Sequence, residues 1–318
     1  MPLLSYEDVR AAGTRIRGHV RPVAVADFEE GGLAPSAVSL CLEHLQHTGS
    51  FKARGALNFS TSLTTTGSVP DAGVTIASGG NAGLACAWAA RASGIRATVF
   101  VPETAPTVKV QKLRRLQADV RLVGSSYGEA LEACQAFAAD TGAIASHAYD
   151  HPLIAAGAGT LVDEVVAVRP EVTTLVVAVG GGGLFAGAAT AANHLGLRVV
   201  AVEPTGCRAL AASLEAGRPV DVEVQSIAAD SLGARRVSQL AFDAARTFDV
   251  VSVIVEDEDI VSARRRVWDN CRLAVEHGAA TALAALLCGA YQPAPTEKVA
   301  VVLCGANTDP GDLVATTP

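Results

Sequence analysis

Aromatic side chains are scarce in this sequence, since Phe, Trp and Tyr make up only 4% of its 318 residues. Charged residues reach 18%, and the formal net charge of -7 leaves no dense basic stripe. The strongest basic run, 264–266, follows the acidic stretch 256–259, so we expect a solvated helix face there. These features argue against nucleic acid as a partner.

Long hydrophobic runs are also missing, because Gly, Thr and charged residues interrupt every apolar stretch before it reaches the length of a membrane span. The first residues show no basic start followed by an apolar block, so no signal peptide is expected. No CxxC pair occurs among the seven cysteines, most of which lie in apolar contexts. This pattern is typical of small buried side chains in a reducing compartment. We therefore expect a cytoplasmic protein with no membrane partner.

Half of the residues are hydrophobic, and short β-branched runs alternate with longer Ala-rich stretches. Continuous apolar runs are typical of parallel strands that are covered on both faces. The alternation therefore predicts an α/β fold, with parallel sheets and helices on both of their faces. The predicted strands are 74–78, 96–101, 119–124, 174–180, 197–203, 249–255 and 297–305. A helix is predicted over 81–94, and "SYED" at 5–8 matches a capping box at the start of another.

The predicted strands fall into two sets, one before residue 148 and one after it. We expect two lobes with a cleft between them: a large domain of residues 1–45 and 148–318, and a small domain of residues 46–147. The chain is long enough for two packed lobes of this kind.

A lysine stands at an unusual place in "HTGSFKARGALNF", residues 47–59. Lys52 follows the tight "TGS" and Phe51, where a turn ends and an apolar helix begins. Taken alone, this stretch is also compatible with an ordinary surface lysine on a helix.

Four consecutive glycines, Gly180 to Gly183, lie between a Val-rich strand and an Ala-rich helix. Glycine allows backbone N–H groups to converge on an anion, and a helix N-terminus adds partial positive charge, so a phosphate is the expected ligand. The alternative is a turn whose glycines only permit close packing. The run lacks both the GxGxxG spacing and the GKS/T of nucleotide-binding loops.

Two more stretches place polar residues after predicted strands. In "ASGGNAGLA" (77–85), Ser78 and Asn81 are suited to hold a carboxylate or a ring hydroxyl, although ordinary helix capping is an alternative. In "VVLCGANTD" (301–309), Cys304 ends an apolar strand, where a buried cysteine usually serves packing alone.

Together these stretches resemble the fold type II pyridoxal-phosphate (PLP) enzymes, whose fold is like that of the tryptophan synthase β subunit. The resemblance is to the serine/threonine dehydratase (ammonia-lyase) family, and it covers nearly the whole chain. The blocks that carry it are "CLEHLQHTGSFKARGALN", "SGGNAG", "HPLIAAGAGTLVDEVV", "VGGGGLFAG", "VEPTG", "SLGARR", "VEDEDI", "AVEHGAATALAAL" and "LCGAN".

The resemblance implies a role for each matching residue. Lys52 would form the Schiff base with the PLP aldehyde, which requires a neutral amine; a desolvated pocket favours that form. The implied cofactor contacts are Phe51, Asn81, Gly180, Gly181, Gly182, Gly183, Leu184, Gly233 and Cys304. The implied substrate-carboxylate site consists of Thr48, Ser50, Ser78, Asn81 and Ala82.

The implied activity is α,β-elimination of L-serine and/or L-threonine, a lyase reaction of amino-acid metabolism that yields a 2-oxo acid and ammonia. Freed Lys52 would take the Cα proton as general base. Cys304 stands opposite the pyridine nitrogen in this family, and a thiol holds that nitrogen protonated less well than a carboxylate would. The resulting weaker electron sink favours elimination over transamination.

The chain departs from the family at several positions. The racemases carry a proton-transferring serine where this chain has Gly79, so racemisation is not expected. His44 and His277 replace residue types that are common in relatives, which leaves substrate choice open. Relatives that hold a cation near "EPTG" use a second acidic residue where this chain has Ala209 beside Glu203, so no metal is expected.

Three alternatives remain open at this stage. One is a PLP-dependent lyase for another β-substituted amino acid such as 3-hydroxyaspartate. The second is β-replacement, as in cysteine synthases. Those enzymes resemble "TGSxKDR", from which "TGSFKAR" of this chain departs, so β-replacement is less expected. The third is a PLP-binding sensor without turnover, against which an intact Lys52 argues. A homodimer is expected from the family alone.

Overall fold

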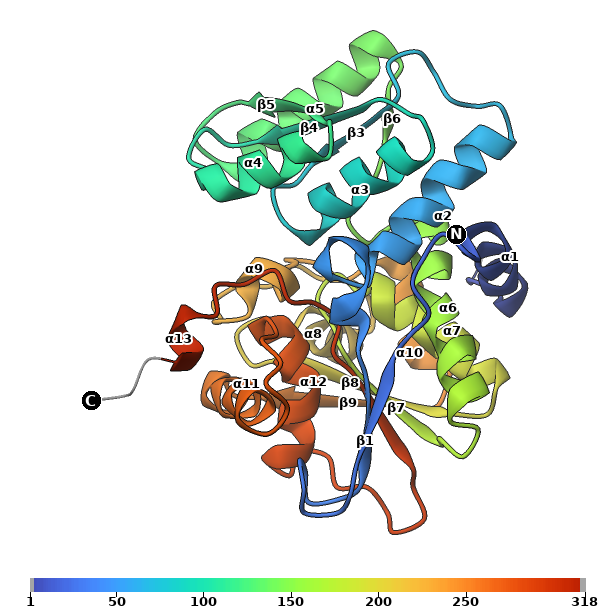
Figure 1. Cartoon of the computed structure of the whole chain (residues 1–318), viewed down its shortest axis with the longest axis vertical. Coiled ribbons are helices and arrows are strands. Elements are labelled where there is room, and N and C mark those ends of the chain that lie inside the picture. The colour runs from blue at the N-terminus through green and yellow to red at the C-terminus, as the bar shows by residue number, and fades with distance from the viewer. Residues whose placement is uncertain (1–2, 315–318) are drawn as a thin grey trace.

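Two sheets with helices around them make up the computed structural model, which describes residues 3–314 (Figure 1). The six-stranded sheet has the order β1-β2-β10-β7-β8-β9, and the four-stranded sheet has the order β5-β4-β3-β6. The strands are β1 (Val25–Phe28), β2 (Val38–Cys41), β3 (Val74–Ala77), β4 (Ala97–Val101), β5 (Asp119–Leu122), β6 (Ile144–Ala145), β7 (Thr174–Ala178), β8 (Arg198–Pro204), β9 (Val250–Val255) and β10 (Val299–Val302). All seven predicted strands are present, with small differences at their ends.

The predicted α/β fold with parallel sheets is confirmed, and one edge strand that was not predicted is antiparallel. Strand β1 runs antiparallel to β2, with Val25 opposite Cys41, whereas every other pairing is parallel. The connection between β1 and β2 contains no helix, and a parallel pairing would need a long crossover there.

Helices cover both faces of the six-stranded sheet, with α11 and α12 on one side and α6, α7 and α10 on the other (Figure 1). The helices of the two lobes are α1 (Tyr6–Ile16), α2 (Lys52–Thr65), α3 (Asn81–Ala92), α4 (Thr107–Arg115), α5 (Tyr127–Thr141), α6 (Pro152–Val168), α7 (Gly183–His194), α8 (Ala209–Ala216), α9 (Ala229–Leu232), α10 (Gln239–Thr247), α11 (Asp257–Cys271), α12 (His277–Leu287) and α13 (Gly311–Val314), with 3-10 turns η1 (Glu43–Leu45) and η2 (His47–Gly49). The capping box at the start of α1 is confirmed, since Ser5 and Asp8 exchange hydrogen bonds there.

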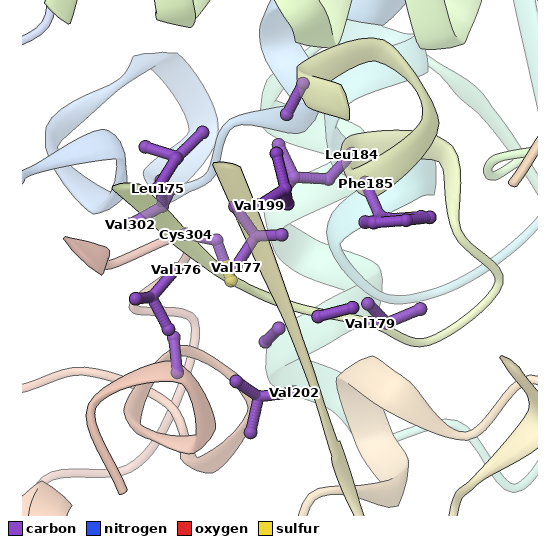
Figure 2. Packing of buried hydrophobic residues seen from close by; sticks show 14 of the residues in the cluster. Leu175, Val176, Val177, Val179, Leu184, Phe185, Val199, Val202, Val302 and Cys304 are labelled. Carbon is purple, nitrogen blue, oxygen red and sulfur yellow. The ribbon is translucent and has the colours of Figure 1, made fainter. Parts of the chain in front are cut away.

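The main core lies between β7 and the flanking helices. Every residue of β7 is buried, which is why its sequence reads as one apolar run. Figure 2 shows the side chains of this strand with those of β8, β10 and the start of α7, and the sulfur of Cys304 lies among them. Cys304, which follows β10, and the glycines that follow β7 therefore lie close together at one end of this core.

Helix α2 packs against both α3 and α6, so it contacts both lobes. The predicted domain boundaries at 45/46 and 147/148 therefore stay a prediction. Across the described residues, no helix is long and apolar enough to cross a membrane.

The solvated face that we expected at 264–266 is wrong for its first residue. Arg264 is buried, because α11 turns it toward the chain terminus. Its guanidinium donates to Val275 O and Asp309 O and pairs with Asp312.

Candidate active site

A pocket lies at the carboxyl ends of β7 and β10 and faces the start of α3. Ligands of parallel α/β sheets bind at such strand ends. The residues that line it are Phe51, Lys52, Asn81, Tyr149, Ala178, Gly180, Gly181, Gly182, Gly183, Leu184, Phe185, Ser231, Leu232, Glu276 and Cys304. All the predicted cofactor contacts except Gly233 are in this set. Ser231 and Leu232, the two residues that precede Gly233, line the pocket instead.

Lys52 is the first residue of α2, with Phe51 at the N-cap position. Its Nζ donates to Ala148 O at 3.1 Å and lies 4.9 Å from the centre of the Phe51 ring. Burial lowers the pKa of the Lys52 amine, while Cys304 and Glu276 act in the opposite direction. The lysine thus reaches inward, where the neutral amine is favoured.

A buried ion cluster holds α2 in place two residues after Lys52. Arg54 is fully buried, and its guanidinium forks onto both carboxylate oxygens of Glu43 at 2.7 and 2.8 Å. It also donates to Glu164 of α6 at 2.7 and 2.8 Å. Planar bidentate pairing of this kind sets orientation as well as distance, so it fixes where α2 begins.

The four glycines are required by the protein packing alone. A Cβ at Gly180 would collide with the backbone of Leu232, and one at Gly181 or Gly183 would collide with Tyr149. Gly182 has φ of +92°, which other residues rarely adopt. The close-packing interpretation therefore holds, and it does not exclude an anion site. The first N–H groups of a helix have no intrahelical partner. Helix α7 begins here without a side-chain cap, so no capping side chain accepts from these N–H groups.

Asn81 does not cap α3, so the capping alternative for its side chain is wrong. The N-cap position is Gly80, and no side chain caps this helix end. The Asn81 amide instead donates to Glu276 at 2.8 Å and accepts from Asn307 Nδ2 at 2.7 Å. Ser78 Oγ accepts from the Gly80 N–H. Ala82 is buried in the first turn of α3.

Thr48 and Ser50 lie beside this network but do not line the pocket. Their hydroxyl oxygens are buried and have no hydrogen-bond partner. Buried polar atoms are normally satisfied, so orphaned hydroxyls mark a place for a polar ligand. Thr48 also has φ of 61°, a strained conformation for a β-branched residue, of the kind found at functional sites.

Cys304 is buried at the end of β10. Burial raises the pKa of its thiol, and the nearby Glu276 adds to the effect. The side chain is therefore a neutral thiol at physiological pH. It can act as a weak partner for a ring nitrogen but cannot supply a full negative charge.

Glu276 and Tyr149 line the pocket but were not among the site residues predicted from the sequence. Glu276 is 7% exposed, and burial raises the pKa of its carboxyl while Asn81 and Lys52 lower it. Tyr149 packs on the glycines, and its hydroxyl donates to Arg236 O. Glu276 is the only carboxylate in "AVEHGAATALAAL", and this was the one feature of the sequence that could have indicated it.

Glu203 makes a structural contact with the start of α8. Both of its oxygens accept from backbone N–H groups, those of Leu210 and Ala211, at 2.7 and 2.8 Å. Burial raises its pKa to about 7. Among the described residues, no group of three or more His, Cys, Asp or Glu side chains is arranged to hold a metal ion.

The residues in the pocket fit PLP on chemical grounds. The amine of Lys52 suits an aldehyde, and the uncapped start of α7 suits an anionic phosphate. The Asn81 amide supplies a donor for a ring oxygen, and Cys304 supplies a neutral group for a ring nitrogen.

Comparisons with known proteins agree with this chemistry. The family model described as "Pyridoxal-phosphate dependent enzyme" matches residues 26–305. The chain is 35% identical to an L-threonine ammonia-lyase of Geobacter sulfurreducens, over 96% of this chain and 76% of that one. It is 36% identical to a human "Serine dehydratase-like" protein, over 91% of each. The solved structure of maize serine racemase aligns with a TM-score of 0.91 at 28% identity, over 98% of this chain and 96% of that one. The chain therefore belongs to the pyridoxal-phosphate dependent enzyme family, and PLP is its cofactor.

Proposed function

We propose that this protein is a PLP-dependent serine/threonine ammonia-lyase, which eliminates the β-hydroxyl of L-serine and/or L-threonine to give a 2-oxo acid and ammonia. The relatives named L-threonine ammonia-lyase and "Serine dehydratase-like" support the reaction class. The observation that carries the proposal is the inward-facing Lys52 amine, with a neutral thiol at Cys304 in the same pocket.

Bound PLP supplies an aldehyde for amines and a ring that delocalises negative charge from Cα. The part of Lys52 is to take the proton from the substrate Cα, which requires the neutral amine. Burial lowers the pKa of this amine and so increases the neutral fraction. Phe51, against which the lysine packs, keeps water away from it.

The substrate carboxylate is assigned to the segment around Thr48, Ser50 and Ser78, with the start of α3. Two orphaned hydroxyls there, those of Thr48 and Ser50, are ready to donate to a carboxylate. Because α3 has no side-chain cap, the N–H groups of Asn81 and Ala82 add donors and partial positive charge. This grip would set the Cα–H bond of the substrate relative to Lys52.

The cofactor contacts of the proposal are Phe51, Lys52, Asn81, Gly180, Gly181, Gly182, Gly183, Leu184, Gly233 and Cys304. Of these, the glycines and Leu184 would hold the phosphate at the start of α7. Gly233 would contribute backbone beside the ring, next to the lining residue Leu232.

Elimination is favoured over racemisation by the absence of an acid or base at Gly79. Racemisation needs a second group that exchanges a proton on the opposite face of Cα, and glycine has none. The neutral thiol of Cys304 also weakens the electron sink, which disfavours a long-lived carbanion. The likeness to maize serine racemase is then one of fold.

Two other functions stay open for test. One is a lyase for another β-substituted amino acid such as 3-hydroxyaspartate, because His44 and His277 leave substrate choice undecided. The other is a sensor that binds PLP without turnover.

The deciding assay incubates the purified holoenzyme with L-serine, L-threonine, their D-isomers and 3-hydroxyaspartate, and measures 2-oxo acid. Turnover of L-serine or L-threonine supports the proposal, whereas turnover of 3-hydroxyaspartate alone supports the first alternative. A bound-cofactor absorbance band without any turnover supports the sensor. Lys52→Ala should lose that band and all turnover, while Lys112→Ala, on the exposed surface, serves as the matched lysine control.

A small domain of residues 46–147, a homodimer and a cytoplasmic location belong to the same proposal. The seven free cysteines suit a reducing compartment. Light scattering of the purified protein tests the dimer.

A further inference from the structure

Asn81 is held from two sides by residues that belong to the other sheet. It starts α3, which packs on the four-stranded sheet, whereas Glu276 precedes α12 and Asn307 follows β10 of the six-stranded sheet. Its Nδ2 lies 2.8 and 3.1 Å from the two carboxylate oxygens of Glu276. Its Oδ1 accepts from Asn307 Nδ2 at 2.7 Å. These contacts bridge the two lobes at the pocket.

The direction of this chain of hydrogen bonds is set by one backbone carbonyl. Asn307 Nδ2 donates to Thr48 O at 2.7 Å, and a carbonyl oxygen can only accept. Asn307 must therefore keep its NH₂ group on this side, where it also donates to Asn81 Oδ1. The Asn81 NH₂ group is then forced toward Glu276, which as a carboxylate can only accept. Flipping either amide would create two repulsive contacts.

Glu276 is a buried carboxylate at the pocket wall, and a backbone N–H of Asn307 donates to it in addition to the Asn81 side chain. It occupies the N-cap position of α12, yet its side chain makes no capping hydrogen bond. A buried carboxylate is costly unless it is paired. The side-chain partner of this carboxylate is the Asn81 NH₂ group. Residue 305 is a glycine, and a Cβ at that position would collide with the Glu276 carboxylate. The surrounding chain thus makes room for Glu276 at the pocket wall.

We propose that Glu276 and Asn307 are positioning residues, which hold Asn81 with its NH₂ group toward the ring of the cofactor. The proposal rests on the proposed cofactor site, in which the Asn81 amide donates to a ring oxygen. An Asn81 in the flipped orientation would present a carbonyl oxygen there and repel that oxygen. The hydrogen bonds to Glu276 and Asn307 therefore determine whether Asn81 presents a donor or an acceptor to the cofactor ring.

Three variants separate positioning from a structural role. Asn307→Asp removes the NH₂ group that faces Asn81 and Thr48, so it should destabilise the protein; Asn81 then lies between two carboxylates, and its amide loses its preferred orientation. Combining it with Glu276→Gln offers a turned Asn81 amide a donor, so folding stability should recover with the Asn81 amide in the reversed orientation. Glu203→Gln is the matched control, because Glu203 is also a buried carboxylate but lies outside the pocket.

The readouts are the melting temperature of the cofactor-free protein, the dissociation constant for PLP and the absorbance band of bound PLP. We expect Asn307→Asp to weaken PLP binding by about 10- to 100-fold, the value of one hydrogen bond to a charged group. The double variant should regain melting temperature yet bind PLP as weakly as Asn307→Asp, with a shifted band. The control should lose melting temperature and keep both the PLP affinity and the band.

Tight PLP binding with an unchanged band in the double variant would overturn the proposal. So would Glu276→Leu alone leaving PLP affinity and band unchanged, since a side chain without an acceptor would then leave Asn81 in the same position. Turnover by the wild type is measured separately. A wild type that binds PLP but forms no 2-oxo acid would refute the proposed function while leaving the positioning role intact.

Discussion

Replacing Arg54 with methionine tests whether the buried ion cluster anchors the helix that begins with Lys52. Arg54 is 0% exposed and its partner Glu43 is 1% exposed, so water cannot replace the guanidinium at that carboxylate. Removing one partner of a buried pair costs about 3–5 kcal/mol. Glu164 is 32% exposed and can be hydrated, so we assign the cost to Glu43. We expect Arg54→Met to lower the free energy of unfolding by about 3 kcal/mol or more.

Urea unfolding of the variant and wild type, compared at unchanged slope, measures this loss. The control is Arg208→Met, because Arg208 also contacts both oxygens of its partner Glu215, but at the surface, where the side chains are 44% and 62% exposed. Its loss should stay below about 1 kcal/mol. Equal losses in the two variants would refute the reasoning that burial decides the cost.

A second variant distinguishes the stranded charge from lost packing. Combining Arg54→Met with Glu43→Leu removes both members of the fully buried pair, so most of the lost stability should return. No recovery would mean that the geometry of the ion cluster itself, rather than an unpaired carboxylate, supports the start of α2.

Three further predictions follow from single residues. The pKa of Glu203 is raised from 4.5 to about 7, so its contribution to stability is complete below pH 4.5 and falls by about 3 kcal/mol by pH 7. Glu203→Gln should abolish that decline in urea titrations, and an unchanged pH dependence of the variant would contradict this prediction. Gly79→Ser should give measurable conversion of L-serine to D-serine by chiral chromatography, because a Cβ there meets only the side chain of Val101, whose Cγ1 lies 3.2 Å away. A folded variant that forms no D-serine would count against Gly79 as the cause. Cys304→Asp should increase transamination relative to elimination, seen as accumulation of pyridoxamine phosphate, whereas Cys304→Ser should not.

Most of the predicted strands have a continuous apolar sequence, although β5, which is largely exposed, was predicted as well. Strands such as β7 and β4 are buried at every position, so they appear as unbroken apolar runs. The strands that were missed are short or partly exposed. Strand β6 has only 2 residues, and β1 is a 4-residue edge strand without a fully buried position. Their pairing is decided by neighbours in space, which a local pattern does not record.

The candidate site divides in the same way. Lys52, Asn81 and the glycines lie in compact motifs, so a resemblance was sufficient to select them. Glu276 and Asn307 lie 195 and 226 positions from Asn81, and neither belongs to a local pattern that indicates the contact. The burial of Arg264 was missed for a related reason: only the packing of α11 against the chain terminus reveals which arginine of the run turns inward.

The contacts of Arg264 with residues 309–312 support the wall of the pocket. The guanidinium joins Asp309 and Asp312 to Val275, the residue before Glu276. Trimming the protein ahead of residue 308 would strand a charge beneath α12 and loosen the wall that faces the cofactor.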